Sequence, residues 1–422
     1  MNTRGPLLLL LLASLPAWPA HARESLERLV AAAPPGATIT VPAGVHAVHL
    51  KLDKPVTLAG VPGAVLDGGG SGDVVRIGAP GVNVRGLVIR NSGTDLTATN
   101  AGIFVERQAR DVTLQGNRIE ETLFGVYLDG ASNVRVLHNV IRGMRALRVA
   151  DRGDGIHMWN DSGCIVEGND VAGSRDGIYV YVSPHNIIAR NYVHEVRYGV
   201  HYMYSQDNLL LGNVSRGNLA GFALMSSDHL RVLDNVAGDD QAYGILLNYI
   251  SHSEFAGNRV YRIKGQGDDA GGTIEGGEGR ALFVYLSQFN DIHDNLIAAS
   301  QVGIHVTAGS EDNRLWGNRF VGNLVQVKYV QNLAQEWSAR GRGNYWSDYL
   351  GWDLDGNGIG DVPFRPNDGV DVLFWRYPSA RVLMSSPAVL LLRYVQRAFP
   401  VFTPPSVQDS RPLMHAPAGF HP

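Results

Sequence analysis

Short apolar segments alternate with single polar or glycine positions along most of the chain, and the alternation is periodic. Asparagine follows an apolar segment at nine positions, most of them 22 or 23 residues apart. Glycine keeps the same period, and both series lengthen at the same two places. Because a unit this short cannot bury its apolar face alone, the repeats must stack on one another. The asparagines are Asn117, Asn139, Asn169, Asn191, Asn213, Asn235, Asn258, Asn295 and Asn318, and the glycines are Gly102, Gly125, Gly155, Gly177, Gly199, Gly221, Gly244 and Gly303.

The repeated segments are predicted to be strands, since they are short, rich in β-branched residues and bounded by glycine or asparagine. Glycine provides the backbone conformations that sharp corners need, and asparagine side chains satisfy backbone groups in turns. We therefore expect an all-β fold, a right-handed parallel β-helix of roughly ten or eleven coils of about 22 residues. Leucine-rich repeats have a similar period, but their L-x-x-L-x-L pattern is missing, and propeller blades are about twice as long.

The two ends of the chain differ from the repeats and divide it into three parts. Residues 1–22 combine a basic residue, a short apolar run and an A-x-A site, which predicts a secretory signal peptide cleaved after Ala22. Residues 23–340 are expected to form the β-helix, with a short helix from Ser25 to Ala33 that caps its first coil. Residues 341–422 are expected to form a C-terminal tail that contains a helix.

Composition and charge exclude some classes of protein. The net charge is −4, with 36 Lys and Arg and 40 Asp and Glu spread along the chain. The sequence has no basic stripe, so nucleic acid is not expected as a partner. Cys164 is the single cysteine, so the chain forms no internal disulfide. A buried, small apolar role for this thiol is more common than a role as nucleophile or metal ligand.

Strand alternation assigns the residues that follow each repeat glycine to the two faces of a sheet. The first and third positions are mostly aliphatic, which predicts that they point inward. The second and fourth positions then point outward, and they include histidine, methionine and aromatic residues. At the second position lie Tyr127, His157, Tyr179, His201, Ala223 and His305, and at the fourth lie Asp129, Trp159, Tyr181, Met203, Met225 and Asn248.

Four residues of this outward patch, His201, Met203, Met225 and His157, are candidate metal ligands. His201 and Met203 are expected about 7 Å apart on one strand, and Met225 about 4.8 Å from Met203 on the next coil. Imidazole together with thioether sulfur is a ligand set that suits Cu(I). Two other interpretations are open, because the patch can also be core covered by another segment or an aromatic face that binds sugars. Spacing alone does not rank the metal and sugar interpretations.

The tail contains a loop rich in aspartate and glycine. Asp353, Asp355, Asn357 and Asp361 bracket glycines as in calcium-binding loops, which makes them candidate Ca²⁺ ligands. The bidentate glutamate of an EF-hand is missing, since its position holds Phe364. A turn rich in Asp and Gly that binds no metal is therefore the alternative.

The tail also contains a strongly apolar segment that is predicted to be a helix from about Pro387 to Phe399. Ser386 before it is a favourable N-cap, and proline suits the first helical position. The helix is too short to span a membrane. It is expected to pack on the β-helix or to dock on a partner through its apolar side chains. The candidate docking residues are Leu391, Tyr394, Val395 and Phe399.

Four stretches of the sequence together resemble the NosD family. They are YGVHYMYSQDN, GFALMSSDHLRVLDN, GNYWSDYLGWDLDGNGIGDVPF and PSARVLMSSPAVLLLRYVQRAFPVF, and the resemblance covers nearly the whole chain after the signal peptide. Many exported proteins share the β-helix repeats, whereas the C-terminal stretch is specific. The resemblance implies a periplasmic protein that helps to mature the copper sites of nitrous oxide reductase. It implies as partners an ABC transporter with its ATPase and membrane permease, a copper chaperone and the apo form of the reductase.

Two classes of function are open at this point. The first is a metallochaperone or scaffold without enzymatic activity, which presents copper, as transiently bound Cu(I), or the apo-reductase, with calcium as a second candidate metal. The second is a polysaccharide-binding protein, a lyase or a glycosidase. Its candidate catalytic groups are Asp154 and Asp176 on adjacent coils, with Arg152 and Arg175 nearby. The same two aspartates are more typical of turn caps.

Overall fold

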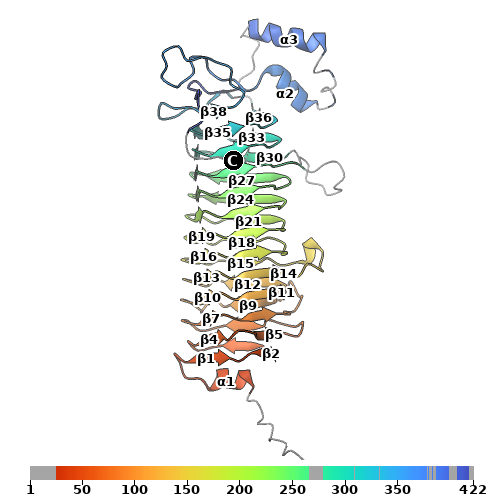
Figure 1. The fold of residues 1–422 in the computed structure, drawn as a ribbon, viewed down its shortest axis with the longest axis vertical. Coiled ribbons are helices and arrows are strands. Elements are labelled where there is room, and N and C mark those ends of the chain that lie inside the picture. Colours follow the sequence, from red (N-terminus) through yellow and green to blue (C-terminus); the bar gives the residue numbers. More distant parts are fainter. Residues whose placement is uncertain are drawn as a thin grey trace, which may run out of the picture.

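The computed structural model describes residues 25–265, 279–307, 309–331, 333–377, 379, 383, 386–398 and 406–417. The described chain winds into a parallel β-helix with three long sheets, which Figure 1 shows as a column. Sheets A and C each have 12 strands and sheet B has 13. The predicted all-β parallel β-helix is thus confirmed. The predicted number of roughly ten or eleven coils is too low, because the coils before Gly102 carry neither of the repeats that revealed the others.

Each complete coil contributes one strand to sheet A, then one to sheet B and one to sheet C. Sheet A contains β1 (Thr38–Val41), β4 (Thr57–Gly60), β7 (Asn83–Arg85), β10 (Thr113–Gln115), β13 (Arg135–Leu137), β16 (Ile165–Glu167), β19 (Ile187–Ala189), β22 (Leu209–Leu211), β25 (Arg231–Leu233), β28 (Glu254–Ala256), β31 (Asp291–His293) and β34 (Arg314–Trp316). Sheet B contains β2 (Gly44–Ala47), β5 (Ala64–Asp67), β8 (Val88–Arg90), β11 (Arg118–Thr122), β14 (Val140–Gly143), β17 (Asp170–Ala172), β20 (Tyr192–His194), β23 (Val214–Arg216), β26 (Val236–Gly238), β29 (Arg259–Tyr261), β32 (Leu296–Ala298), β35 (Arg319–Val321) and β38 (Tyr345–Trp346). Sheet C contains β3 (Leu50–Leu52), β6 (Val75–Ile77), β9 (Ala101–Val105), β12 (Phe124–Asp129), β15 (Ile156–Trp159), β18 (Ile178–Tyr181), β21 (Tyr198–Met203), β24 (Ala220–Asp228), β27 (Tyr243–Ser251), β30 (Arg280–Tyr285), β33 (Val302–Val306) and β36 (Val325–Tyr329).

The core is a continuous column of apolar side chains that point into the space between the three sheets. Equivalent residues of successive coils stack in register, as Ile178, Val200 and Phe222 do in sheet C. Burial of each such side chain stabilises the fold by about 1.5–3 kcal/mol. The column is closed at its N-terminal end by helix α1 (Leu26–Ala32), which buries two apolar residues against the first coil. The predicted capping helix is therefore confirmed.

The repeat asparagines form a buried ladder that links the coils from inside. Oδ1 of Asn191 accepts hydrogen bonds from the backbone N–H and from Nδ2 of Asn169, at 3.0 and 2.9 Å. Nδ2 of Asn191 donates to the carbonyl of Val166 at 2.9 Å and to Oδ1 of Asn213 at 2.9 Å. Each asparagine thus satisfies buried polar groups of two neighbouring coils, which water does not reach. The ladder extends along the repeats as far as Asn344.

The repeat glycines are required for a reason that differs from the predicted one. None of the eight has a positive φ angle, and they lie where adjacent coils approach closely. A Cβ atom on Gly177 would lie 2.1 Å from Cγ1 of Val193 and 2.5 Å from the carbonyl oxygen of Gly199. The corners instead use other residues with positive φ, such as Tyr204 and Asp207 at 51° and 55°. The prediction that these glycines provide corner conformations is therefore wrong.

The C-terminal end of the β-helix carries helices α2 (Gly369–Arg376) and α3 (Pro387–Ala398), which lie at the opposite end of the column from α1 in Figure 1. Strand β38 continues sheet B beyond residue 340 by pairing with β35. Strand β37 (Gln335–Glu336) pairs with β39 (Val407–Gln408), which follows α3 in the chain. The segment with α2 and α3 therefore lies between two parts of the chain that are paired with the β-helix. Among the described helices, none is long and apolar enough to cross a membrane.

Asp409, next to β39, ends the asparagine ladder. Its Oδ2 accepts hydrogen bonds from the backbone N–H of Asn344 at 2.7 Å and from Nε1 of Trp346 at 2.9 Å. Asp409 is completely buried, so the ladder is closed by a residue that lies far along the chain from its other members. This contact fixes the returning tail on the last coil.

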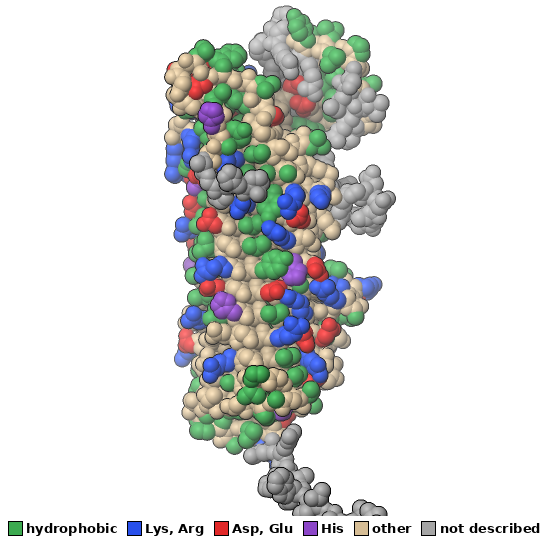
Figure 2. Space-filling model, in the orientation of Figure 1, with side chains coloured by type: hydrophobic (Ala, Val, Ile, Leu, Met, Phe, Trp, Pro, Cys, Tyr) green, Lys and Arg blue, Asp and Glu red, His purple; other side chains and the backbone are tan. Residues whose placement is uncertain are grey.

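The surface of the column mixes charges of both signs. On the face in Figure 2, Lys and Arg side chains are interspersed with Asp and Glu side chains along the middle of the column. Neighbouring coils contribute ion pairs such as Arg142–Asp170 at 2.7 Å and Arg190–Glu167 at 2.6 Å. This face therefore has no large field of one sign. The predicted signal peptide, residues 1–22, lies outside the described residues.

Candidate functional site

The outward patch predicted from the sequence lies on sheet C, over strands β15, β18, β21 and β24. In the strand register, His201 of β21 lies opposite Tyr179 of β18, and Met203 of β21 lies opposite Met225 of β24. The alternate residues of these strands point into the core and are completely buried. They include Val200, Tyr202, Phe222 and Leu224. The predicted assignment of inward and outward positions is therefore confirmed.

The three candidate ligands on β21 and β24 differ in exposure. His201 is 7% exposed, whereas Met203 and Met225 are half-buried. Met225 also packs against a small apolar cluster on the outer face that includes Ala223 and Leu246. The patch is therefore neither fully covered core nor open surface, since it combines a buried imidazole with two half-buried thioether side chains.

The His201 imidazole is held by a carboxylate from the preceding coil. Nδ1 of His201 lies 2.9 Å from Oδ2 of Asp176, which is completely buried. The two oxygens of Asp176 also accept hydrogen bonds from the Arg197 guanidinium, at 2.8 and 2.7 Å. Burial opposes ionisation, but the hydrogen bonds from His201 and Arg197 outweigh it and lower the pKa of Asp176 to about 2. Asp176 is therefore an anion at neutral pH.

The second ring nitrogen of His201, Nε2, is buried and has no hydrogen-bond partner. Buried polar atoms without a partner are uncommon, and each one calls for an explanation such as an ion. Metal-binding histidines usually direct one nitrogen to a carboxylate or carbonyl and the other to the metal. Because thioether sulfurs lie at the adjacent outward positions, these residues fit a soft ion such as Cu(I).

Tyr179 contacts both His201 and Met203. Its ring stacks on the His201 imidazole with the ring centres 4.5 Å apart and the planes at 28°. Its hydroxyl donates to Sδ of Met203 at 3.3 Å. On the other side, the Tyr179 ring meets His157 edge-on at 5.0 Å. His157 is thus separated from His201 by a tyrosine ring, and the structure does not bring it into contact with the other candidate ligands.

A second imidazole held by a carboxylate lies on the preceding part of sheet C. Nδ1 of His157 lies 2.7 Å from Oδ2 of the buried Asp154, whose two oxygens each accept a hydrogen bond from Arg175 at 3.2 Å. Asp154 also accepts the backbone N–H of Asp176 at 3.3 Å. The two aspartates considered as a catalytic pair are therefore engaged with arginine, histidine and the next turn. Because Asp176 is ionised, it has no proton to donate as a general acid.

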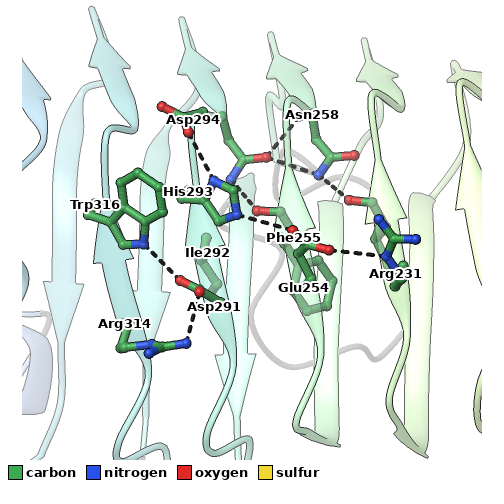
Figure 3. A network of polar contacts seen from close by, with 12 residues as sticks. Arg231, Glu254, Phe255, Asn258, Asp291, Ile292, His293, Asp294, Arg314 and Trp316 are labelled. Atoms are coloured by element: carbon green, nitrogen blue, oxygen red, sulfur yellow. Dashed lines mark hydrogen bonds and ion pairs between the residues drawn. The ribbon is translucent and has the colours of Figure 1, made fainter. Parts of the chain in front are cut away.

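Two other histidines show how His201 differs from an ordinary structural histidine. In Figure 3, both ring nitrogens of His293 on sheet A have carboxylate partners, Asp294 at 2.9 Å and Glu254 at 3.4 Å. His305 on sheet C has no hydrogen-bond partner at either nitrogen, and burial lowers its pKa to about 2. His201 instead combines one anchored nitrogen with one buried nitrogen that has no partner.

The remaining candidate for a soft ligand is Cys164, which points into the core. The side chain is buried, and burial raises the pKa of its thiol to about 12. The group is therefore a thiol at neutral pH, which is the small apolar role expected for it. In the part of the chain that the structure describes, no three His, Cys, Asp or Glu side chains are grouped so that they could hold a metal ion.

The carboxylates of the Asp- and Gly-rich loop bind the backbone of the loop itself. Asp353 accepts hydrogen bonds from three backbone N–H groups at 2.7–3.2 Å, and these, above all the one from Gly358, lower its pKa. Asp361 accepts another loop N–H at 2.8 Å, and Asp355 and Asn357 hydrogen-bond to each other at 2.8 Å. These contacts are those of a turn stabilised by aspartate side chains. Calcium binding by these four residues stays a prediction.

The predicted tail helix is present as α3. Its first turn is capped by Ser386, whose Oγ accepts the backbone N–H of Val389 at 3.3 Å. Val389 packs against Val370 and Phe374 of α2 and is the buried apolar residue on this side of the helix. The pair of helices therefore has a small apolar core of its own.

The other side of α3 is apolar and exposed. Leu391 and Tyr394 are 63% and 68% exposed, and Val395 is half-buried. Leu390, one residue before Leu391, is 59% exposed. The fourth candidate docking residue, Phe399, lies outside the described residues. The described chain thus leaves an apolar helix side uncovered, as a docking role requires.

Comparison with solved structures shows the same architecture in proteins of several functions. The A-module of a mannuronan C-5 epimerase from Azotobacter vinelandii has a TM-score of 0.58 at 16% identity, over 74% of this chain and 93% of the module. A family 28 exopolygalacturonase from Yersinia enterocolitica has a TM-score of 0.51 at 12% identity, over 72% of this chain and 73% of the enzyme. At such identities the similarity shows a shared fold and no shared activity.

Other proteins are much more similar to this chain in sequence than these structures are. The family model described as "Periplasmic copper-binding protein (NosD)" matches residues 137–351. A protein of Pseudomonas aeruginosa named "Probable ABC transporter binding protein NosD" is 51% identical over 98% of this chain and 96% of its own length. A protein of the same name from Stutzerimonas stutzeri is 52% identical over 89% of this chain and 86% of its own length. The chain therefore belongs to the NosD family of periplasmic copper-binding proteins.

Proposed function

We propose that this protein is a non-enzymatic periplasmic accessory protein that receives or presents copper while the copper sites of nitrous oxide reductase mature, together with an ABC transporter. Membership of the NosD family supports copper handling in the periplasm, and the names of two relatives support association with an ABC transporter. The observation that carries the proposal is the buried Nε2 of His201, which has no hydrogen-bond partner and belongs to the same outward face of sheet C as the paired Met203 and Met225.

Copper is the cargo in this proposal, and His201, Met203 and Met225 are its ligands. The two methionines lie opposite each other on strands about 4.8 Å apart, so both sulfurs can reach one ion. The two thioether sulfurs are soft donors and imidazole nitrogen is a common copper ligand, so the set suits Cu(I) better than harder cations. Because the methionines are half-buried, a donor or acceptor protein can approach the ion from outside. His157 is left out of the ligand set, because Tyr179 separates it from His201.

The exposed side of α3 is the proposed docking surface for the transporter. Leu391 and Tyr394 are the most exposed of the candidate docking residues, with Val395 beside them and Phe399 following the described helix. An apolar helix side that the described residues leave uncovered fits a membrane permease or its ATPase-bound assembly. The copper chaperone and the apo-reductase are then left to dock along the β-helix, near the methionines of sheet C.

Export is the remaining part of the proposal. A signal peptide over residues 1–22 places the mature chain, which begins at Arg23, in the periplasm. Sequencing of the N-terminus of protein isolated from periplasm is expected to start at Arg23. A retained leader would contradict cleavage after Ala22.

An anaerobic titration of Cu(I) against a competing chelator tests the copper site. The mature wild-type protein is expected to bind one equivalent, and His201→Ala, Met203→Ala and Met225→Ala are each expected to lose at least about tenfold in affinity, like other losses at a metal site. His305→Ala is the matched control, because His305 occupies the same outward row of sheet C. Wild-type protein that fails to compete, or candidate variants that bind as tightly as the control, would overturn the assignment.

Polysaccharide binding is the second candidate function, and exposed aromatic side chains favour it. Trp159 is 40% exposed in the outward row of sheet C that contains Met203, and Tyr204 and Tyr249, which each follow a residue of that row in the chain, are 51% and 57% exposed. The ion-paired state of Asp154 and Asp176 weighs against cleavage of the polymer. Incubation of the purified protein with uronate polymers tests this function. Binding or degradation would support it, and the absence of both would remove it.

A further inference from the structure

The carboxylate of Asp176 is built into the β-helix more firmly than a turn cap requires. It is completely buried and accepts four hydrogen bonds from the next coil. Two come from the Arg197 guanidinium at 2.8 and 2.7 Å, one from Nδ1 of His201 at 2.9 Å and one from the backbone N–H of Tyr198 at 3.3 Å. The paired contacts with arginine restrict both the position and the plane of the carboxylate.

This arrangement fixes which nitrogen of His201 carries the proton. A carboxylate that is paired with a guanidinium only accepts hydrogen bonds, so Nδ1 of His201 must be the donor. In a neutral imidazole the other nitrogen, Nε2, then keeps its lone pair. Nε2 is the atom that is buried without a partner. The contact between Nδ1 and Asp176 therefore explains both the proton on Nδ1 and the free lone pair on Nε2.

The orientation of the ring is fixed as well. The His201 imidazole stacks on Tyr179 at 4.5 Å and meets the ring of Tyr198 edge-on at 5.0 Å, with the planes at 79°. With Nδ1 tied to Asp176 and two tyrosine rings packed against the imidazole, rotation about the side-chain bonds of His201 is restricted. The direction of Nε2 is therefore set before any ion arrives, which is the condition for a well-defined ligand.

We propose that Asp176 and Arg197 are positioning residues of the copper site, which hold His201 in the tautomer and orientation that present Nε2 to Cu(I). This inference rests on the proposed function. Neither residue touches the ion, and both act through the imidazole. The preceding coil offers a comparison, because Asp154 and Arg175 hold His157 by the same types of contact but do not contact His201.

Asp176→Asn and Asp154→Asn form a matched pair of variants that tests the inference. Each keeps the size of the side chain and removes the charge of one carboxylate that holds a histidine. Nitrogen-15 NMR of protein with labelled histidine reports the tautomer of His201 without copper, assigned by comparison with His201→Ala. Chelator competition reports the Cu(I) affinity. Far-ultraviolet circular dichroism and thermal unfolding report whether each variant keeps its fold.

The wild-type protein is expected to show His201 with its proton on Nδ1. Asp176→Asn is expected to move population to the Nε2–H tautomer and to lower Cu(I) affinity about 10–100-fold, the usual effect of losing such a partner. Asp154→Asn is expected to change neither quantity. In the double variant with His201→Ala, Asp176→Asn is expected to cause no further loss, because its effect passes through the imidazole.

Different results would contradict the proposed function and the positioning role of Asp176 and Arg197. A wild-type protein that does not bind Cu(I) overturns both the proposed function and this inference. A wild-type protein that binds Cu(I), with Asp176→Asn binding equally well, overturns the inference alone. Wild-type His201 with its proton on Nε2 also overturns it, and this measurement needs no variant at position 176 to fold. Equal losses in Asp176→Asn and Asp154→Asn would show a general structural effect and would overturn it too.

Discussion

Asp161 lies at a buried position that serine occupies in the following coils. We predict that Asp161→Ser stabilises the protein. Ser183 occupies the equivalent position in the next coil. Its hydroxyl accepts a hydrogen bond from the backbone N–H of Asp161 at 3.0 Å and donates one to the carbonyl of Tyr181 at 2.9 Å. Asp161 accepts the N–H of Ala131 at 2.6 Å, but its second oxygen is buried without a partner. Burial raises the pKa of Asp161 to about 8. A serine would repeat both contacts of Ser183 without a buried acid.

The magnitude follows from the difference between the folded and unfolded pKa. An unfolded aspartate titrates near pH 4, whereas Asp161 in the fold titrates at about 8. The stability that the protonated acid contributes is fully present below about pH 4 and is lost as the pH rises towards 8. The loss is about 1.4 kcal/mol for each pH unit, so it reaches about 4 kcal/mol between pH 4.5 and pH 7.5.

Urea unfolding of the wild type and of Asp161→Ser at both pH values measures this difference. The two proteins are expected to be similarly stable at pH 4.5, and the variant is expected to be more stable by about 4 kcal/mol at pH 7.5. The titrating groups that do not interact with Asp161 are shared and cancel in the comparison. The reverse change one coil later, Ser183→Asp, is the matched control and is expected to lose stability as the pH rises. A difference between wild type and Asp161→Ser that is the same at both pH values would refute the reasoning.

Three further predictions concern the packing of the coils, the anchoring of the tail and the docking helix. Gly244→Ala is expected to lower the free energy of unfolding by about 1–3 kcal/mol, since the new Cβ would lie 2.2 Å from a valine side chain; an unchanged urea midpoint would contradict this. Asp409→Ala is expected to lower the free energy of unfolding by about 2–4 kcal/mol, because it leaves two buried N–H donors without their acceptor. Thermal unfolding and proteolysis of the tail measure this loss, and a tail as resistant to proteolysis as that of the wild type would contradict it. Leu391→Asp combined with Tyr394→Asp is expected to abolish co-purification with the transporter while leaving unfolding and Cu(I) affinity unchanged; retained co-purification would show that α3 is not the docking surface.

Much of the fold was predictable because the repeats carry the information locally. A period of 22 or 23 residues with apolar positions at alternate residues determines which side chains meet across coils, so it placed Met203 opposite Met225 and His201 on the outer face. The early coils were undercounted, because strands such as β1 and β4 are held by packing and parallel pairing without the asparagine ladder. The repeat glycines were correctly found but wrongly explained, since close approach between backbones leaves no signature that differs from a need for positive φ.

The contacts that define the site were less accessible from sequence. Asp176 and Arg197 were missed as partners of His201, because residues 25 and 21 positions apart meet only through the geometry of one coil turn. Their signal was present, since Asp176 stands directly before the repeat glycine of one coil and Arg197 stands two residues before that of the next. His157 was grouped with the other candidates by its outward register, but the intervening row of Tyr179 could not be seen as a barrier without the side-chain packing. Asp409 follows the last repeat asparagine so late in the chain that no period indicates it.

X-ray absorption at the copper K-edge of the protein loaded with one equivalent of Cu(I) tests the central claim most directly. If His201, Met203 and Met225 hold the ion, the spectrum should show about two sulfur neighbours and one imidazole nitrogen, a soft ligand set. The imidazole contribution should disappear in His201→Ala and persist in His305→Ala. A first shell of oxygen and nitrogen alone, or a spectrum that His201→Ala leaves unchanged, would contradict the account.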